Sequence, residues 1–189
     1  MKTKAISLLS GGLDSLLASR IVMNLGIDVI GLHFTSPLCN AIKDDDGRKA
    51  IRAGRELGIR VLVRDKGDEY LEVVRNPRHG YGKNMNPCID CRIYMLRLTS
   101  RIMAEEGASF IITGEVLGQR PMSQGKATMN IIENESGLKG LILRPLSAKL
   151  FPPTIPEVEG TVDREKLFDV RGRSRMRQYA MTREYGLRE

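Results

Sequence analysis

Apolar and polar positions divide most of the chain into short apolar runs separated by longer amphipathic stretches. The apolar runs are rich in Ile, Val and Leu, and they predict buried parallel strands over 5–9, 27–34, 59–63, 108–112 and 141–143. The amphipathic stretches between them predict helices over 14–25, 48–57, 68–74 and about 87–106. This alternation predicts an α/β fold with a doubly wound, mainly parallel five-stranded sheet.

The pattern changes after residue 150. The stretch from Phe151 to Thr161 is rich in proline, so we expect neither helix nor interior strand there. The tail from Arg171 to Arg188 carries six arginines and predicts a basic helix. We therefore expect a main domain over 1–150, and a proline-rich connector with a basic C-terminal helix over 151–189. The sequence stops soon after this predicted helix, with no further helix or strand to complete the fold, which suggests a truncated C-terminus.

Composition narrows the class of protein. No apolar run approaches the length of about 18 residues that a membrane span needs, and no signal peptide precedes the first strand, so we expect a cytoplasmic protein without membrane contact. Two of the three cysteines form a CxxC pair, which favours metal, redox or nucleophilic chemistry over a disulfide framework. The net charge of +7 favours a polyanionic partner, although a solvated basic surface gives the same composition.

The first candidate site is the SGGLDS stretch at 10–15, between the first strand and the first helix. Free backbone N–H groups and the positive end of the helix dipole attract anions there, and the glycines allow close approach. Ser10 and Ser15 add hydroxyl donors, so the stretch suits phosphate. Its spacing fits neither GxxxxGK[ST] nor GxGxxG. A plain turn capped by Asp14 or Ser10 is the alternative.

The second candidate site is the CxxC pair in Asn86–Arg92. Pro87 predicts a helix start, so Cys88 and Cys91 fall in its first turn and on one face. A helix N-terminus and the neighbouring Arg92 favour thiolates. The residues alone leave three readings open: a redox pair, half of a zinc or cluster site, or two small apolar side chains.

The SGGLDS stretch resembles the PP-loop, SGGxDS, of the ATP pyrophosphatases, whose fold is adenine nucleotide alpha hydrolase-like. Members of that superfamily cleave ATP between its α and β phosphates. The resemblance implies that Ser10, Gly11, Gly12 and Ser15 hold pyrophosphate, and that Asp14 helps to place Mg²⁺.

Two later segments resemble tRNA thiouridine synthetases, which are themselves PP-loop enzymes. NPCIDCR at 86–92 resembles the NPCxxCN segment of the 2-thiouridylases, and Cys91 falls on their sulfur-handling cysteine. TGEVLGQ at 113–119 with Ser123-Gln124 resembles TGESLGQxxSQ of the 4-thiouridine synthetases, with one additional residue before the Ser-Gln pair. The string RPL follows at 144–146. These matches imply that Gly114, Gln119 and Arg144 lie at the ATP site.

The combined resemblance implies an ATP-dependent sulfurtransferase that adenylates a carbonyl oxygen, expected on a tRNA uridine, and replaces it with sulfur. The implied partners are ATP, Mg²⁺, tRNA and a sulfur donor, either a persulfide protein or sulfide, and a homodimer is an additional expectation. Sulfur could arrive as a persulfide on Cys91, with Cys88 resolving it. Some thiolases of this superfamily instead hold a 4Fe-4S cluster on three cysteines, for which this chain offers Cys39, Cys88 and Cys91.

Two other functions remain open from the sequence. PP-loop ligases that use ammonia share the loop but have no need for CxxC. A non-catalytic RNA-binding or sulfur-carrier module is the other alternative. The tail arginines favour RNA contact, because arginine pairs with phosphates and stacks on bases, although a solvated helix face is an equal alternative. The residues concerned are Arg171, Arg173, Arg175 and Arg177.

Overall fold

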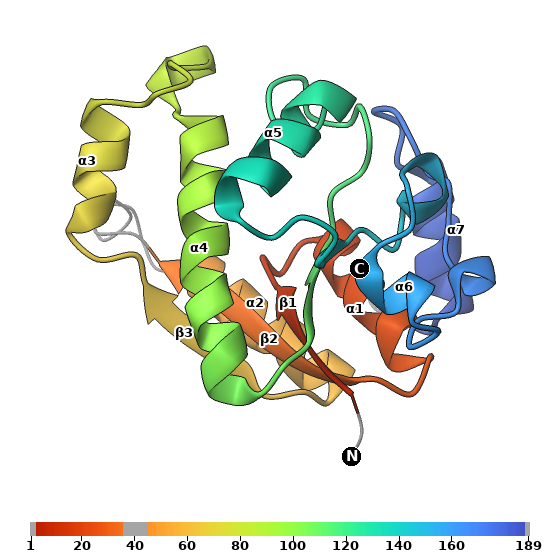
Figure 1. Ribbon diagram of the computed structural model, residues 1–189. Coiled ribbons are helices and arrows are strands. Elements are labelled where there is room, and N and C mark those ends of the chain that lie inside the picture. The colour runs from red at the N-terminus through yellow and green to blue at the C-terminus, as the bar shows by residue number, and fades with distance from the viewer. Residues whose placement is uncertain (1–2, 36–44, 188–189) are drawn as a thin grey trace.

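The computed structural model describes residues 3–35 and 45–187 of the chain. Within them a single sheet of parallel strands has the order β3-β2-β1-β4-β5 (Figure 1). This arrangement confirms the predicted α/β class and its five strands. The strands are β1 (Lys4–Leu8), β2 (Asp28–Thr35), β3 (Val61–Asp65), β4 (Phe110–Thr113) and β5 (Ile142–Leu143).

Helices cover both faces of the sheet. On one face α1 lies beside α2 and α7, and on the other α4 crosses the sheet with α3 and α5 packed against it (Figure 1). The α-helices of the described residues are α1 (Leu13–Met23), α2 (Asp45–Leu57), α3 (Glu69–Arg75), α4 (Cys88–Glu106), α5 (Lys126–Ser136), α6 (Ile155–Val158) and α7 (Met176–Glu184).

The central strand β1 shows why the sheet is buried on both sides. Ala5 packs into the cluster formed with α1, whereas Ile6 packs into the cluster on the α4 side. Successive side chains of a strand point to opposite faces, so both faces need apolar residues. The register pairs Leu8 of β1 with Leu32 and with Thr113. The segments that follow β1 and β4 therefore leave the sheet side by side at one edge.

The segment after β5 returns to the same core. Val162, Leu167, Val170 and Met181 belong to the apolar cluster that contains Leu17 of α1. Residue 171 forms a parallel bridge with Leu117, and the tail helix begins only at Met176. The C-terminal segment therefore lies against the loop that follows β4.

The expectation that 151–161 contains no helix was wrong. The short helix α6 begins after Thr154, whose backbone N–H donates to the carboxylate of Glu157 at 2.7 Å. Pro156 lies in the first turn, where an α-helix makes no internal N–H bond that proline would remove. No helix within residues 3–35 and 45–187 has both the length and the apolar character needed to cross a membrane.

Candidate active site

The loop between β1 and α1 forms the first part of the site. Gly11 has a φ of +77°, and a Cβ there would lie 2.5 Å from the backbone carbonyl carbon of Lys49, so both conformation and packing require glycine. The Ser15 hydroxyl donates to the carbonyl of Gly12 at 2.9 Å and lies 3.1 Å from the hydroxyl of Ser10. The two hydroxyls therefore share one side of a tight turn at the start of α1.

A cavity of about 170 Å³ lies over this loop. Three arginines from distant parts of the chain reach it: Arg92 from α4, Arg120 from the loop after β4, and Arg175 from the C-terminal segment. Guanidinium groups, serine hydroxyls and a helix N-terminus all favour a bound anion. The other residues that line the cavity are Leu8, Ser10, Gly12, Leu13, Asp14, Ser15, Thr113, Gly114 and Gln124.

Asp14 is held by side chains from two other segments. Its Oδ2 accepts a hydrogen bond from the amide of Gln119 at 2.7 Å, and it lies 3.5 Å from the guanidinium of Arg175. Gln178 of α7 donates in turn to Gln119 at 3.2 Å. The other oxygen of Asp14, Oδ1, is buried and has no hydrogen-bond partner in the described part of the chain. A carboxylate oxygen without a partner, beside a cavity whose lining favours anions, fits a Mg²⁺ ligand.

Gly114 brings the loop after β4 onto the start of α1. A Cβ at this position would lie 2.5 Å from the backbone nitrogen of Ser15, closer than carbon and nitrogen can approach without bonding. Gly114 was predicted at the ATP site, and the structure places it in the cavity lining. Its visible role is to permit close packing of the two loops.

A buried charge network lies beside the cavity. The carboxylate of Glu115, 2% exposed, accepts hydrogen bonds from Arg92 Nε at 2.8 Å and from Arg144 Nε at 3.1 Å. Burial alone would raise the pKa of Glu115, but the two guanidiniums together hold that pKa below its usual range. Thr113 donates a further hydrogen bond at 3.1 Å. Glu115 therefore stays charged and fixes the position of Arg92.

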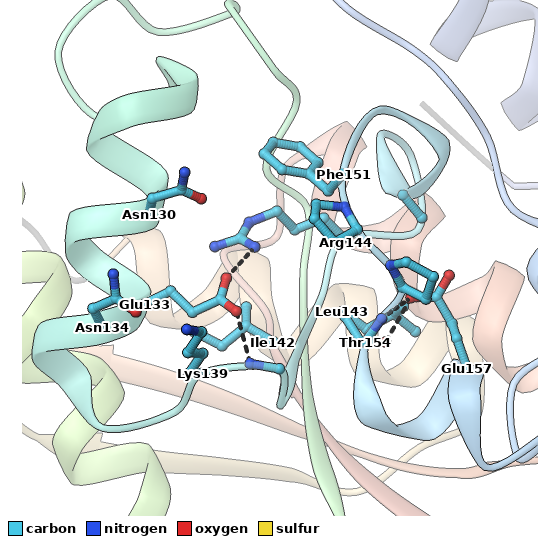
Figure 2. A pocket seen from close by; sticks show the side chains of 14 residues that line it. Asn130, Glu133, Asn134, Lys139, Ile142, Leu143, Arg144, Phe151, Thr154 and Glu157 are labelled. Atoms are coloured by element: carbon cyan, nitrogen blue, oxygen red, sulfur yellow. Dashed lines mark hydrogen bonds and ion pairs between the residues drawn. The ribbon is translucent and has the colours of Figure 1, made fainter.

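Arg144 lies apart from the loop cavity. Besides Glu115, it pairs with Glu133 at 2.8 Å, and its guanidinium lies 5.4 Å from the Phe151 ring centroid (Figure 2). It lines a different cavity of about 320 Å³, between α5 and the segment around 148–157. The structure therefore does not bring Arg144 to the predicted phosphate site, because two carboxylates hold it elsewhere.

The CxxC pair lies where the sequence predicts it. Helix α4 begins at Cys88, directly after Pro87, so both thiols fall in the first turn. The sulfur of Cys91 accepts a hydrogen bond from the Tyr70 hydroxyl at 3.2 Å and lies 3.6 Å from the ammonium of Lys66. Both thiols are partly exposed. The residue after Cys91 is Arg92, so the start of α4 borders the loop cavity.

The structure describes two of the three predicted cluster ligands, Cys88 and Cys91. Cys39 lies outside the described residues, and those residues contain no group of three His, Cys, Asp or Glu side chains arranged to hold a metal ion.

The tail arginines separate into different environments. Arg171 forms the bridge to Leu117, Arg177 pairs with Asp169 at 2.6 Å, and Arg173 is exposed. Only Arg175 of these four reaches the loop cavity. Sequence reasoning missed this role, and it also missed Arg120, which lies in the stretch where the chain departs from the TGESLGQxxSQ pattern.

Comparison with known proteins identifies the family. The sequence model of the thiamine biosynthesis protein (ThiI) family matches residues 1–149. The chain belongs to the ThiI family. This confirms the resemblance to PP-loop tRNA thiouridine synthetases that was inferred from the motifs.

The curated relatives that this chain matches are longer proteins. A probable tRNA sulfurtransferase of Thermococcus kodakarensis is 32% identical over 146 residues, which cover 76% of this chain and 36% of that protein. One of Methanobrevibacter smithii is 29% identical over 173 residues, covering 88% and 43%. The chain thus matches less than half the length of each of these relatives.

Solved structures share the fold. A 4-thiouridine synthetase in complex with RNA and bound ATP superposes with a TM-score of 0.65 at 21% identity, over 97% of this chain and 51% of that one. The U34-tRNA thiolase NcsA from Methanococcus maripaludis, with its [4Fe-4S] cluster, gives a TM-score of 0.53 at 17% identity, over 99% and 58%. At these identities the likeness confirms the PP-loop ATP pyrophosphatase fold of the ThiI family chain.

Proposed function

We propose that the chain is the ATP-dependent sulfurtransferase unit of a tRNA-thiolating enzyme, which replaces a uridine carbonyl oxygen with sulfur and releases AMP and pyrophosphate. One observation carries this proposal: the loop cavity, with its serines, Asp14 and three arginines, borders a helix start that holds two thiols. Membership of the ThiI family and the names of its relatives support it.

The loop cavity binds the phosphates of ATP in this proposal. Ser10, Gly11, Gly12 and Ser15 hold the pyrophosphate part through backbone N–H groups and hydroxyls. Arg120 and Arg175 offset the negative charge that develops on the leaving pyrophosphate. When bound, Mg²⁺ would neutralise further phosphate charge, with Asp14 Oδ1 as a ligand.

Other residues keep this machinery in position. Gln119 orients Asp14, and Gly114 seats the loop after β4 against Ser15. We assign Arg144 a positioning role through Glu115 rather than direct phosphate contact, because its bonds to Glu115 and Glu133 direct it away from the loop.

The activation step leaves the substrate oxygen bound to AMP. The carbonyl oxygen of the uridine attacks the α-phosphorus of ATP and forms a new O–P bond. The bond from that phosphorus to the bridging oxygen breaks, and pyrophosphate leaves with the electron pair. The carbon of the former carbonyl then carries a good leaving group.

The sulfur step uses both cysteines. A persulfide donor first loads its outer sulfur onto Cys91, and this sulfur attacks the activated carbon, from which AMP leaves with the oxygen. The Cys88 thiolate then attacks Cys91 Sγ, which breaks the S–S bond, releases the thiolated uridine and forms a Cys88–Cys91 disulfide. A thiol reductant restores both cysteines. Tyr70 and Lys66 supply donors to the sulfur of Cys91.

Release of pyrophosphate and mass spectrometry of digested RNA nucleosides test the proposal together. We expect the wild-type chain to release pyrophosphate when given ATP and tRNA, and to form a thionucleoside when a persulfide donor is added. Cys91→Ser should retain pyrophosphate release but form no thionucleoside. Product formation with ammonia that survives Cys91→Ser would favour the ligase, and no pyrophosphate release with any RNA would favour a binding module. Iron and sulfide analysis after anaerobic purification tests the cluster alternative.

A further inference from the structure

A groove of about 310 Å³ lies beside the phosphate loop, over α1 and between α2 and α7. Its floor includes Leu13 and Leu16 of α1, and its rim carries Lys49 and Arg52 of α2. Tyr179 of α7 lines the groove and is 41% exposed. Gly11 belongs to both the loop and the groove, so the groove begins at the phosphate site.

The helices that flank the groove are basic on their exposed sides. Helix α2 exposes Arg48, Lys49, Arg52 and Arg55, and Glu56 is the acid among the residues that line the groove. On the α7 side, Arg177 is exposed but pairs with Asp169, and Arg175 precedes α7 and reaches the loop cavity. The two cations that line the groove, Lys49 and Arg52, both belong to α2 and complement a polyanion that follows this wall, opposite Tyr179 of α7.

We propose that this groove binds a single-stranded segment of the RNA substrate, with one base stacked on Tyr179 and its phosphates paired with Lys49 and Arg52. Single-stranded nucleic acid is bound through exposed aromatic rings and tracks of cations, and the groove combines both. The apolar floor accepts the face of a base. The inference rests on the proposed function, because it names where the RNA lies relative to the ATP site.

Photocrosslinking tests the position of the RNA without any substitution. An oligouridylate 12-mer that contains 5-iodouridine is irradiated with the wild-type chain, and the crosslinked tyrosine is identified by mass spectrometry. Tyr81 is an internal control, since it is 42% exposed but lies on the loop before α4. We expect crosslinks at Tyr179 and few at Tyr81. Equal labelling of both tyrosines, or labelling of Tyr81 alone, overturns the proposal.

Binding of the same RNA to variants tests the chemistry of the groove. Lys49→Gln with Arg52→Gln should weaken RNA binding roughly 20-fold at about 0.1 M salt and lower the salt slope by about 1.4, as expected for two lost phosphate contacts. Arg75→Gln with Arg101→Gln removes the same charge from α3 and α4, on the other face of the sheet, and should leave both quantities close to wild type. Equal effects of the two pairs overturn the proposal.

Two matched substitutions of Tyr179 test whether a base stacks on its ring. Tyr179→Leu should weaken RNA binding at least fivefold, because it removes the aromatic ring, whereas Tyr179→Phe should bind like wild type. Thermal melting verifies that each variant folds, and ATP binding is measured alongside. Weaker ATP binding with unchanged RNA binding would overturn the proposal and assign the groove to the nucleotide. If the wild-type chain binds no RNA, the RNA part of the proposed function fails too. If every groove variant binds RNA like wild type, the assignment of the groove is overturned but the proposed function is not.

Discussion

The side-chain amide of Gln119 donates a hydrogen bond to Oδ2 of Asp14 at 2.7 Å, which joins the loop after β4 to the first turn of α1. Gln178 of α7 donates to Gln119 in turn. The Asp14 carboxylate is therefore oriented by a relay of two amides, and Oδ1 is left available for a ligand.

Removal of this relay should weaken ATP use. Gln119→Leu loses a hydrogen bond to a charged group, worth about 1.5–3 kcal/mol, so we expect the KM for ATP to rise roughly 10- to 100-fold in a pyrophosphate-release assay. Gln119→Glu should be worse, because it sets two carboxylates against each other. Asn134→Leu, an exposed change on α5, serves as the control. A KM for ATP that stays at the wild-type value in Gln119→Leu would show that Asp14 does not need this orientation.

Loss of the buried carboxylate of Glu115 should destabilise the fold. Glu115→Gln leaves Arg92 and Arg144 without their shared counter-charge, and breaking a buried ion pair costs about 3–5 kcal/mol. Urea unfolding should show this loss, whereas Glu105→Gln on the exposed side of α4 should change the free energy of unfolding by less than about 0.5 kcal/mol. Equal midpoints for the two variants would contradict the role of the network.

Loss of the hydrogen bond from Tyr70 to Cys91 should slow the sulfur-transfer step but leave the adenylation step unchanged. We expect Tyr70→Phe to slow thionucleoside formation roughly tenfold, which corresponds to about 1.4 kcal/mol for one hydrogen bond, while pyrophosphate release stays within about twofold. Tyr81→Phe removes a hydroxyl that, among the described residues, donates to backbone carbonyls of α3, and it should affect neither step. A parallel fall in both half-reactions after Tyr70→Phe would contradict a role confined to sulfur.

His79 should make stability depend on pH. Its hydrogen bond to Asp90, at 3.1 Å in the first turn of α4, raises its pKa above 6.5, although burial opposes this, and Glu135 at 3.0 Å adds to the rise. Arg78 also faces Glu135, at 3.5 Å. Because the folded pKa is raised, the stabilisation is complete below about pH 6.5 and disappears as the pH rises through the folded value.

Chemical denaturation across this range tests the effect of His79. Wild type should lose stability relative to His79→Gln as the pH rises above about 6.5, and the difference between the two should level off once His79 is neutral. An NMR titration of the His79 ring measures the pKa directly. Parallel stability curves for wild type and His79→Gln would rule out this contribution.

Local sequence signals predicted the sheet well because each signal is contained in one element. The apolar run of β1 and the glycine turn after it needed no information from elsewhere in the chain, and Pro87 marked the start of α4. The signals failed where a local rule had an exception. The prolines of 151–161 suggested an irregular segment, but Pro156 in the first turn of α6 is compatible with a helix.

Local sequence was enough to predict that the SGGLDS loop opens α1 and that two thiols open α4, because both features depend on residues a few positions apart. The contacts of Arg175 and Gln178 with Asp14 and Gln119 depend on how the folded chain packs, and so does the turn of Arg144 toward Glu115 and Glu133. They arise because β1 pairs in register with β4 and because the C-terminal segment packs against α1. No local pattern of apolar and polar positions encodes them.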